Sequence, residues 1–281
     1  MCLLILALAP RITPSPRRTA PFDWAGQALA VVGLTALVYG LIDGGQSGFG
    51  EPVVIIAFAL ALVTLTGFLA VQAKTAHPLL PLSLFRPRGM RIALFGGFAF
   101  VVGWYGTVFL VSLYLQQHLG LPPMLAGLAF LPSAVVSLAG NLGSGPMTSR
   151  LGTRLPALLG LSSMTVGLIA LMLVAPSGSL WPVAGLVILV GAGGSVAMQA
   201  LIGVVLTSVP PHRAGIASAV LNMFRQIGGA VAIAVFGALI AAPRPFIPGL
   251  RTSFIIAAVL GGLASLACLG IRPRPDAGSH Q

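Results

Sequence analysis

Residues 182–208 read PVAGLVILVGAGGSVAMQALIGVVLTS, an apolar run without a single Asp, Glu, Lys or Arg. The hydrocarbon core of a bilayer is about 30 Å thick, and a helix rises about 1.5 Å per residue, so roughly 20 apolar residues cross it. This run is long enough for one crossing. It therefore predicts a transmembrane helix.

Comparable runs recur along the whole chain. Of its 281 residues, 57% are hydrophobic and 7% are charged, whereas soluble domains carry about 25% charged residues. The runs predict an all-α, polytopic membrane protein with eight transmembrane helices and no room for a soluble domain. The expected spans lie near residues 24–42, 53–72, 92–115, 125–147, 155–175, 182–208, 214–240 and 252–271.

The basic residues predict the orientation of these spans. Twelve of the fifteen fall in alternate gaps, on one side of the membrane: Arg11, Arg17, Arg18, Lys74, Arg86, Arg88, Arg91, Arg150, Arg154, Arg213, Arg272 and Arg274. The opposite side holds only Arg244 and Arg251, and Arg225 lies inside a span. Lys and Arg in short loops remain cytoplasmic, so both termini are expected in the cytoplasm. The net charge of +11 reflects this topology and does not indicate nucleic-acid binding.

The residues that carry catalysis or bind metals are sparse. Cys2 and Cys268 are too few for a disulfide framework, and the four histidines lie in predicted loops or the tail. The sequence contains no HExxH, CxxC or phosphate-binding glycine loop. We therefore expect neither a catalytic site nor a metal or cofactor site, and the chain is not expected to be an enzyme.

Polar residues at membrane depth are the strongest candidates for function. In the span 214–240, Ser218, Asn222 and Arg225 fall within a narrow arc of the helix, with Gln226 at its edge. Arg225 lies about 16 Å from the helix start, close to the middle of the bilayer. It could extend to the cytoplasmic leaflet and only mark that surface. A role in the transport path or in gating is the favoured interpretation.

Further candidates for the transport path lie in other spans: Asn141, Gln199, Trp104, Tyr105 and Gln116. The first two could equally form an interhelical hydrogen bond. The others supply aromatic and amide surface suited to an amphipathic ligand. Pro132 is expected to free a backbone carbonyl inside the fourth span.

No Asp or Glu is expected within a span, because Asp23 and Asp43 only flank the first one. Proton-coupled transport usually relies on a membrane carboxylate that can titrate. If the chain belongs to a proton-driven transporter, its coupling acid is therefore expected outside this chain.

Five stretches, by their order and spacing, resemble the fourteen-helix drug/proton antiporters of the major facilitator superfamily, which are multidrug and antiseptic efflux transporters. They are FDWAGQALAVVGLTALVYGLIDGG (22–45), HPLLPLSLFRPRGMR (77–91), YLQQHLGLPPMLAGLAFLPS (114–133), SRLGTR (149–154) and AGIASAVLNMFRQIGGAVAIAVFGAL (214–239). The likeness covers nearly the whole chain.

This resemblance implies that the eight spans correspond to helices seven to fourteen of that family. Residues 1–21 would then be the end of a preceding helix and a cytoplasmic linker, although Met1–Ala9 could instead be a peripheral anchor. Residues 22–90 would hold two linker helices and a cytoplasmic loop, residues 91–271 the six-helix C-terminal transporter domain, and residues 272–281 a cytoplasmic tail. The first six-helix domain, with its signature motifs and coupling acids, would be missing.

The resemblance also implies a function. It is proton-driven efflux of drugs or other amphipathic small molecules across a bacterial plasma membrane by alternating access. Arg150, Gly152 and Arg154 would form a gating loop, in which Ser149 replaces the aspartate often found in the family. The expected partners are the lipid bilayer, the substrate and the missing half. A cationic substrate would conflict with Arg225, so either this arginine is paired across the domain interface or the substrate is neutral or anionic.

Two alternatives remain open at this point. The chain could be a truncated or accessory membrane protein that does not transport and needs a partner half. It could also form a channel-like homodimer.

Overall fold

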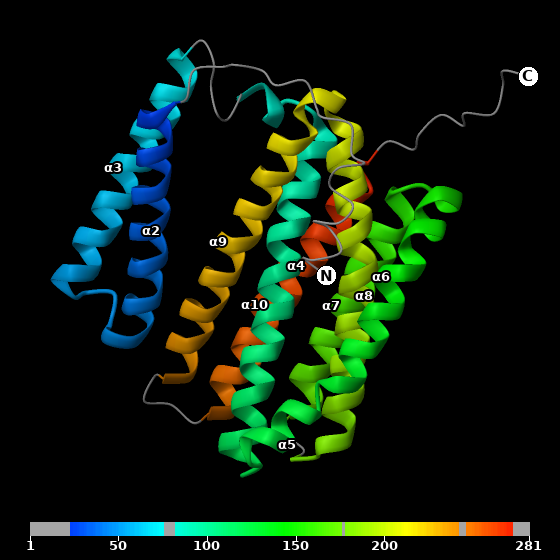
Figure 1. Cartoon of the computed structure of the whole chain (residues 1–281). Coiled ribbons are helices and arrows are strands. Elements are labelled where there is room, and N and C mark those ends of the chain that lie inside the picture. The colour runs from blue at the N-terminus through cyan, green and yellow to red at the C-terminus, as the bar shows by residue number, and fades with distance from the viewer. Residues whose placement is uncertain (1–22, 76–81, 176–177, 242–245, 272–281) are drawn as a thin grey trace, which may run out of the picture.

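The computed structural model describes residues 23–75, 82–175, 178–241 and 246–271 (Figure 1). Within these ranges the chain is helical and has no strand, and eight helical segments are long and apolar enough to cross a membrane. The predicted all-α membrane architecture with eight spans is confirmed. The expectations for residues 1–21 and 272–281 concern segments outside the described residues.

The long helices follow the apolar runs of the sequence. Two short 3₁₀ turns, Leu82–Phe85 and Pro211–Arg213, precede α4 and α9, and a π-helical turn, Tyr114–His118, follows α4. The α-helices are α2 (Trp24–Ser47), α3 (Pro52–Lys74), α4 (Arg88–Leu113), α5 (Pro123–Leu128), α6 (Leu131–Leu151), α7 (Arg154–Val174), α8 (Leu180–Ser208), α9 (Ala214–Ala241) and α10 (Phe246–Cys268).

Helices α4 and α6–α10 form one bundle, and α2 and α3 form a hairpin beside it. Helix α8 packs against α4, α6, α7 and α9, so it is central to the bundle. The hairpin touches the bundle mainly through α2, which contacts α9 (Figure 1). The first residues of α2 and the last residues of α10 lie at the same end of the molecule.

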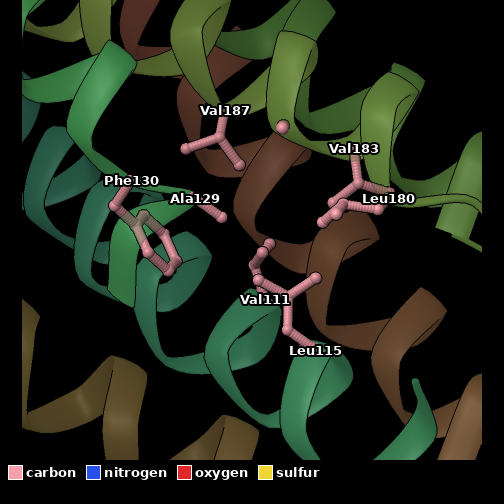
Figure 2. Close-up of a pocket in the computed structure, with 8 residues that line it drawn as sticks. Val111, Leu115, Ala129, Phe130, Leu180, Val183 and Val187 are labelled. Carbon is pink, nitrogen blue, oxygen red and sulfur yellow. The ribbon is translucent and has the colours of Figure 1, made fainter. Parts of the chain in front are cut away.

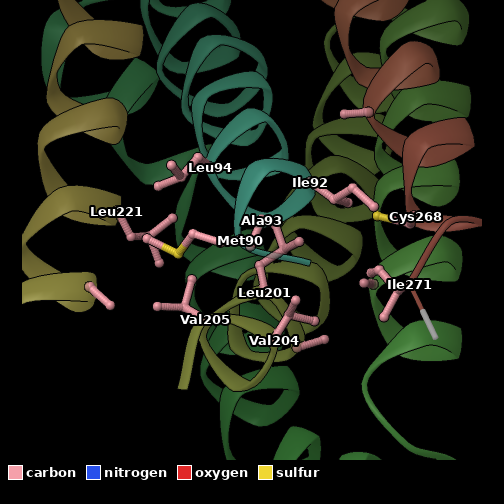
Figure 3. Close-up of a cluster of buried hydrophobic side chains, with 14 of the residues drawn as sticks. Met90, Ile92, Ala93, Leu94, Leu201, Val204, Val205, Leu221, Cys268 and Ile271 are labelled. Carbon is pink, nitrogen blue, oxygen red and sulfur yellow. The ribbon is translucent and has the colours of Figure 1, made fainter. Parts of the chain in front are cut away.

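A buried apolar cluster joins five helices of the bundle, α4 and α7–α10, at that end (Figure 3). Met90 and Ala93 of α4, Leu201 of α8 and Cys268 of α10 are all completely buried there, and Leu221 of α9 joins them. Because lipid tails are as apolar as these side chains, the cluster is stabilised by close packing rather than by exclusion of water. It fixes α4, α8 and α9, which position the site described below.

A carboxylate joins the two helices of the hairpin. The Asp23 side chain caps α2 by accepting a hydrogen bond from the Gly26 backbone N–H (2.8 Å) and accepts a second from Gln72 Nε2 of α3 (2.7 Å). A Cβ on Gly26 would clash with both of these side chains. The glycine therefore allows the amide and the carboxylate to meet.

We expect Asp23→Ala to lower the free energy of unfolding by about 2 kcal/mol, because it removes a helix cap and a hydrogen bond to a charged group. The measurement is thermal unfolding in detergent, and Asp43→Ala at the other end of α2 is the control. A double-mutant cycle with Gln72→Ala should return a coupling of about 1 kcal/mol. Additive effects would contradict a direct link.

Two details of the predicted spans are wrong. Helix α2 continues to Ser47, so Asp43 lies within the last turns of the first span and not in a flanking loop. Helix α10 begins at Phe246, which places Arg251 inside the helix, where Nε donates to the Met172 carbonyl (3.4 Å). Both errors arise because a hydropathy reading ends a span at a charge, whereas backbone hydrogen bonding continues until the helix is capped.

The fourth predicted span is divided into α5 and α6 at Ala129–Phe130. Pro132 consequently lies in the first turn of α6. The N–H that proline lacks there would have no helical partner in any case, so Pro132 frees no carbonyl in mid-span. Pro146 is the proline inside α6, and it leaves the Leu142 carbonyl without its usual donor.

Candidate functional site

A cavity of about 280 Å³ lies between α4, α6, α8 and α9. Among the described residues that line it, α9 contributes the only charged side chain, and the other three helices contribute aromatic, amide, hydroxyl and aliphatic groups. The lining residues are Phe100, Trp104, Ser137, Asn141, Gly191, Ser195, Met198, Gln199, Ile202 and Arg225. Four predicted transport-path residues from four different spans, Trp104, Asn141, Gln199 and Arg225, thus meet around one space.

Helical periodicity explains how the lining is assembled. Phe100 precedes Trp104 by four residues on α4, and Ser137 precedes Asn141 by four residues on α6. Residues four apart lie above one another on one helix face. The sequence analysis missed Phe100 and Ser137. Inspecting positions four residues before each polar or aromatic candidate would have found them, and would also have found Ser195 before Gln199.

Glycines on α8 make room for the aromatic side chains. A Cβ on Gly191 would lie 2.9 Å from Ser137 Oγ and 3.1 Å from Trp104 Cζ3. A Cβ on Gly194 would lie 2.6 Å from Phe100 Cε2. Larger residues at either position would push these side chains away, so the glycines help to give the cavity its shape.

The polar groups of the cavity are only partly satisfied. Gln199 Nε2 donates to Asn141 Oδ1 (3.2 Å) and joins α8 to α6. In the part of the chain that the structure describes, Arg225 Nε and Ser137 Oγ are buried without a hydrogen-bond partner. The aliphatic stem of Arg225 passes Gly97 of α4, where an added Cβ would lie 3.6 Å from Arg225 Cγ. Unsatisfied buried polar atoms are rare and often mark a functional position.

The predicted polar stripe on α9 is divided between two environments. Ser218, Asn222 and Gln226 are exposed and do not line the cavity, whereas Arg225 does. Tyr105 also lies outside it, because its ring packs against Gly229, where an added Cβ would lie 2.9 Å from Tyr105 Cδ2.

Gln116 lies beyond the end of α4, twelve residues after the cavity residue Trp104. It lies in the π-helical turn, where its Nε2 donates to the Ser112 hydroxyl (2.8 Å). The structure therefore does not bring Gln116 together with the other predicted transport-path residues.

The predicted gating loop is a tight connection between α6 and α7. Arg150 is exposed in the last turn of α6, and Arg154 begins α7 and is half-buried. Between them Gly152 has φ +70°, in the region that favours glycine. Ser149 Oγ donates to the Pro146 carbonyl (2.9 Å), so this hydroxyl is used within the loop.

A second, apolar crevice lies at the end of the bundle near α5 (Figure 2). Val111, Leu115, Phe130 and Val183 face one another there, and the crevice is too narrow to hold a water molecule. It has no polar group to orient a ligand. Among the described residues no three His, Cys, Asp or Glu side chains gather where they could hold a metal ion. The polar cavity is therefore the candidate site.

Comparison of the sequence with known proteins assigns the chain to a family. The family model "Major Facilitator Superfamily" matches residues 1–233. "Multidrug resistance protein Stp" of Mycobacterium tuberculosis is 33% identical over 226 residues, which cover 80% of this chain and 42% of that protein. "Methylenomycin A resistance protein" of Bacillus subtilis is 29% identical, covering 90% of this chain and 54% of that protein.

"Multidrug efflux pump LfrA" of Mycolicibacterium smegmatis is 27% identical, covering 85% of this chain and 48% of that protein. The chain thus spans about half the length of the curated relatives it matches. The family model covers far more than half of the chain, and the resemblance to efflux transporters inferred from the sequence is confirmed. The chain is a multi-pass membrane protein that belongs to the Major Facilitator Superfamily.

Proposed function

We propose that this chain forms the C-terminal membrane part of a transporter that exports small amphipathic molecules by alternating access. The observation that carries the proposal is the cavity, in which Trp104, Asn141, Gln199 and Arg225 surround one space within the membrane-spanning bundle. Polar groups at membrane depth are costly and generally serve a transport path or an ion path. The names of the relatives, which refer to multidrug resistance and efflux, support the same function.

Alternating access requires two units that rock about a shared site. A surface of this chain is suited to such a second unit, because Ser218, Asn222 and Gln226 on α9 and Asn141 on α6 are exposed. Facing lipid, these side chains would have no hydrogen-bond partners. We propose that a second six-helix unit covers this surface and completes the cavity, either in the same longer chain or as a separate partner.

The positions of the basic residues support an orientation for the assembly. Arg86, Arg88 and Arg91 near the start of α4 and Arg150 at the end of α6 belong to one end of the bundle. By the positive-inside rule this end faces the cytoplasm, in the plasma membrane of a bacterium such as those that make the relatives. Both termini would lie on that side.

We propose that export is driven by protons, with the titrating carboxylate contributed by the second unit. Among the described residues no acid lines the cavity. Asp23 caps the start of α2, and Asp43 lies in its last turns. Neither of these side chains is placed to exchange a proton with the site.

Export from cells of the native host tests this function. Three matched fluorescent amphiphiles are used, one anionic, one neutral and one cationic. We expect deletion of the gene for this chain to raise the cellular accumulation of at least one of them. Re-expression should reverse the effect, and a protonophore should abolish export. Unchanged accumulation of all three compounds would favour a non-transporting accessory protein.

A further inference from the structure

Two of the buried polar atoms without a partner line the same cavity. They are Arg225 Nε and Ser137 Oγ, which come from α9 and α6. Within the described residues, the third such atom, Tyr114 Oη, belongs to the π-helical turn and does not line this cavity. Both cavity atoms can donate a hydrogen bond, and the guanidinium can only donate. The unmet requirement of this site is thus for an acceptor.

The charge of the cavity agrees with that requirement. Arg225 is the only charged residue among the described residues of the lining. The described acids, Asp23, Asp43 and Glu51, all belong to the ends of α2 and α3. A lone arginine at this depth is stabilised by an anion, and its planar fork suits a carboxylate. A cationic ligand in the same space would be repelled.

The amide pair adds donors to the same lining. In the bond from Gln199 to Asn141, the Asn141 carbonyl oxygen is the acceptor. Asn141 lines the cavity, and its NH₂ group, which only donates, is not used in this bond. Donors thus come from α6 and α9 together.

The rest of the lining is apolar and partly aromatic. Phe100 and Trp104 of α4 and Met198 and Ile202 of α8 supply this surface. The volume of about 280 Å³ is just below the range of about 300–1,000 Å³ that is usual for sites of drug-sized ligands. The cavity is therefore suited to one or two rings that carry a polar end.

We infer that this cavity selects acidic amphiphiles, with an aromatic or other ring against Phe100 and Trp104 and a carboxylate on Arg225. The inference rests on the proposed export function and specifies its substrate class. In this arrangement Arg225 is a binding residue that contacts the cargo. Ser137 and Asn141 complete the set of donors.

The test uses three probes with the same ring system, 1-naphthylacetate, its methyl ester and 2-(1-naphthyl)ethylamine. Their binding to the purified chain in lipid nanodiscs is measured by equilibrium dialysis near neutral pH. We expect the acid to bind at least about tenfold more tightly than the ester, as a charge-assisted hydrogen bond allows. The amine should bind more weakly than either.

Two substitutions of Arg225 test whether this residue causes the preference for the carboxylate probe. Arg225→Gln should remove the advantage of the acid while ester binding persists, which shows that the cavity is intact. Arg225→Lys should keep part of the advantage. Arg251→Gln, on α10 and outside the cavity, should leave the ratio unchanged.

The inference is overturned if the wild-type chain binds the ester or the amine as tightly as the acid, or binds none of the probes. Equal binding of the carboxylate probe and its ester would mean that Arg225 does not recognise the carboxylate. The export assay separates this result from failure of the proposed function. If cells export only the neutral or the cationic amphiphile, the acidic substrate class is refuted but transport is not. If the chain binds the carboxylate probe but cells export none of the amphiphiles, transport is refuted but the binding preference is not.

Discussion

Export by the Arg225→Ala variant is expected to fall about 10-fold to 100-fold, the range that corresponds to losing a charge-assisted contact of about 1.5–3 kcal/mol. The side chain lines the cavity, and its Nε is buried without a partner among the described residues. Removing it deletes the one charge found among the described residues of the lining and opens the space next to Gly97. The measurement is the initial rate of export from preloaded cells that carry equal amounts of the two proteins.

The matched control is Arg251→Ala. This arginine also lies within a span, but it donates to a carbonyl of α7 and does not line the cavity. It should export at the wild-type rate. Both variants should insert normally, because loss of a membrane charge makes insertion easier. If the Arg225→Ala variant exports at the wild-type rate, Arg225 has only a packing role.

The number and approximate place of the spans could be predicted from the sequence, because a bilayer demands long apolar helices and leaves few alternatives. The membrane also explains why Trp104, Asn141, Gln199 and Arg225 could be expected to lie near one another. Polar and aromatic groups at depth tend to face the interior of a bundle. The structure places these four residues around one cavity, and their role in transport stays a prediction.

Which individual side chains point into the cavity could not be predicted in the same way. Tyr105 follows Trp104 directly, yet successive residues of a helix point about 100° apart, and its ring packs on Gly229 while Trp104 lines the cavity. Gln116 was expected to join the path, but the π-helical turn at the end of α4 places it beside Ser112. Such details depend on which helices become neighbours, and apolar patterning carries little of that information in a membrane.

The same limitation applies to the glycines, and the close crossing of α7 and α8 shows its consequence. Helices α7 and α8 meet where a Cβ on Gly193 would lie 2.6 Å from the Gly160 carbonyl oxygen and 2.8 Å from the Met164 backbone nitrogen. These are backbone atoms, which cannot rotate aside as a side chain could. Close approach through small residues is what holds helices together in lipid.

Gly193→Leu should therefore force α7 and α8 apart. Overpacking costs about 1–3 kcal/mol of stability. The added side chain would meet backbone atoms, so we expect a cost near the upper end of that range. The midpoint of thermal unfolding in detergent should then fall by about 6–12 °C. Gly185→Leu on the same helix is the control, because nothing lies within 4 Å of its added Cβ and leucine favours helix over glycine by about 1 kcal/mol. Equal midpoints for the two variants would mean that α7 and α8 can separate without cost. In that case the position of α8, and with it the shape of the cavity, would have to be maintained by its contacts with α4, α6 and α9.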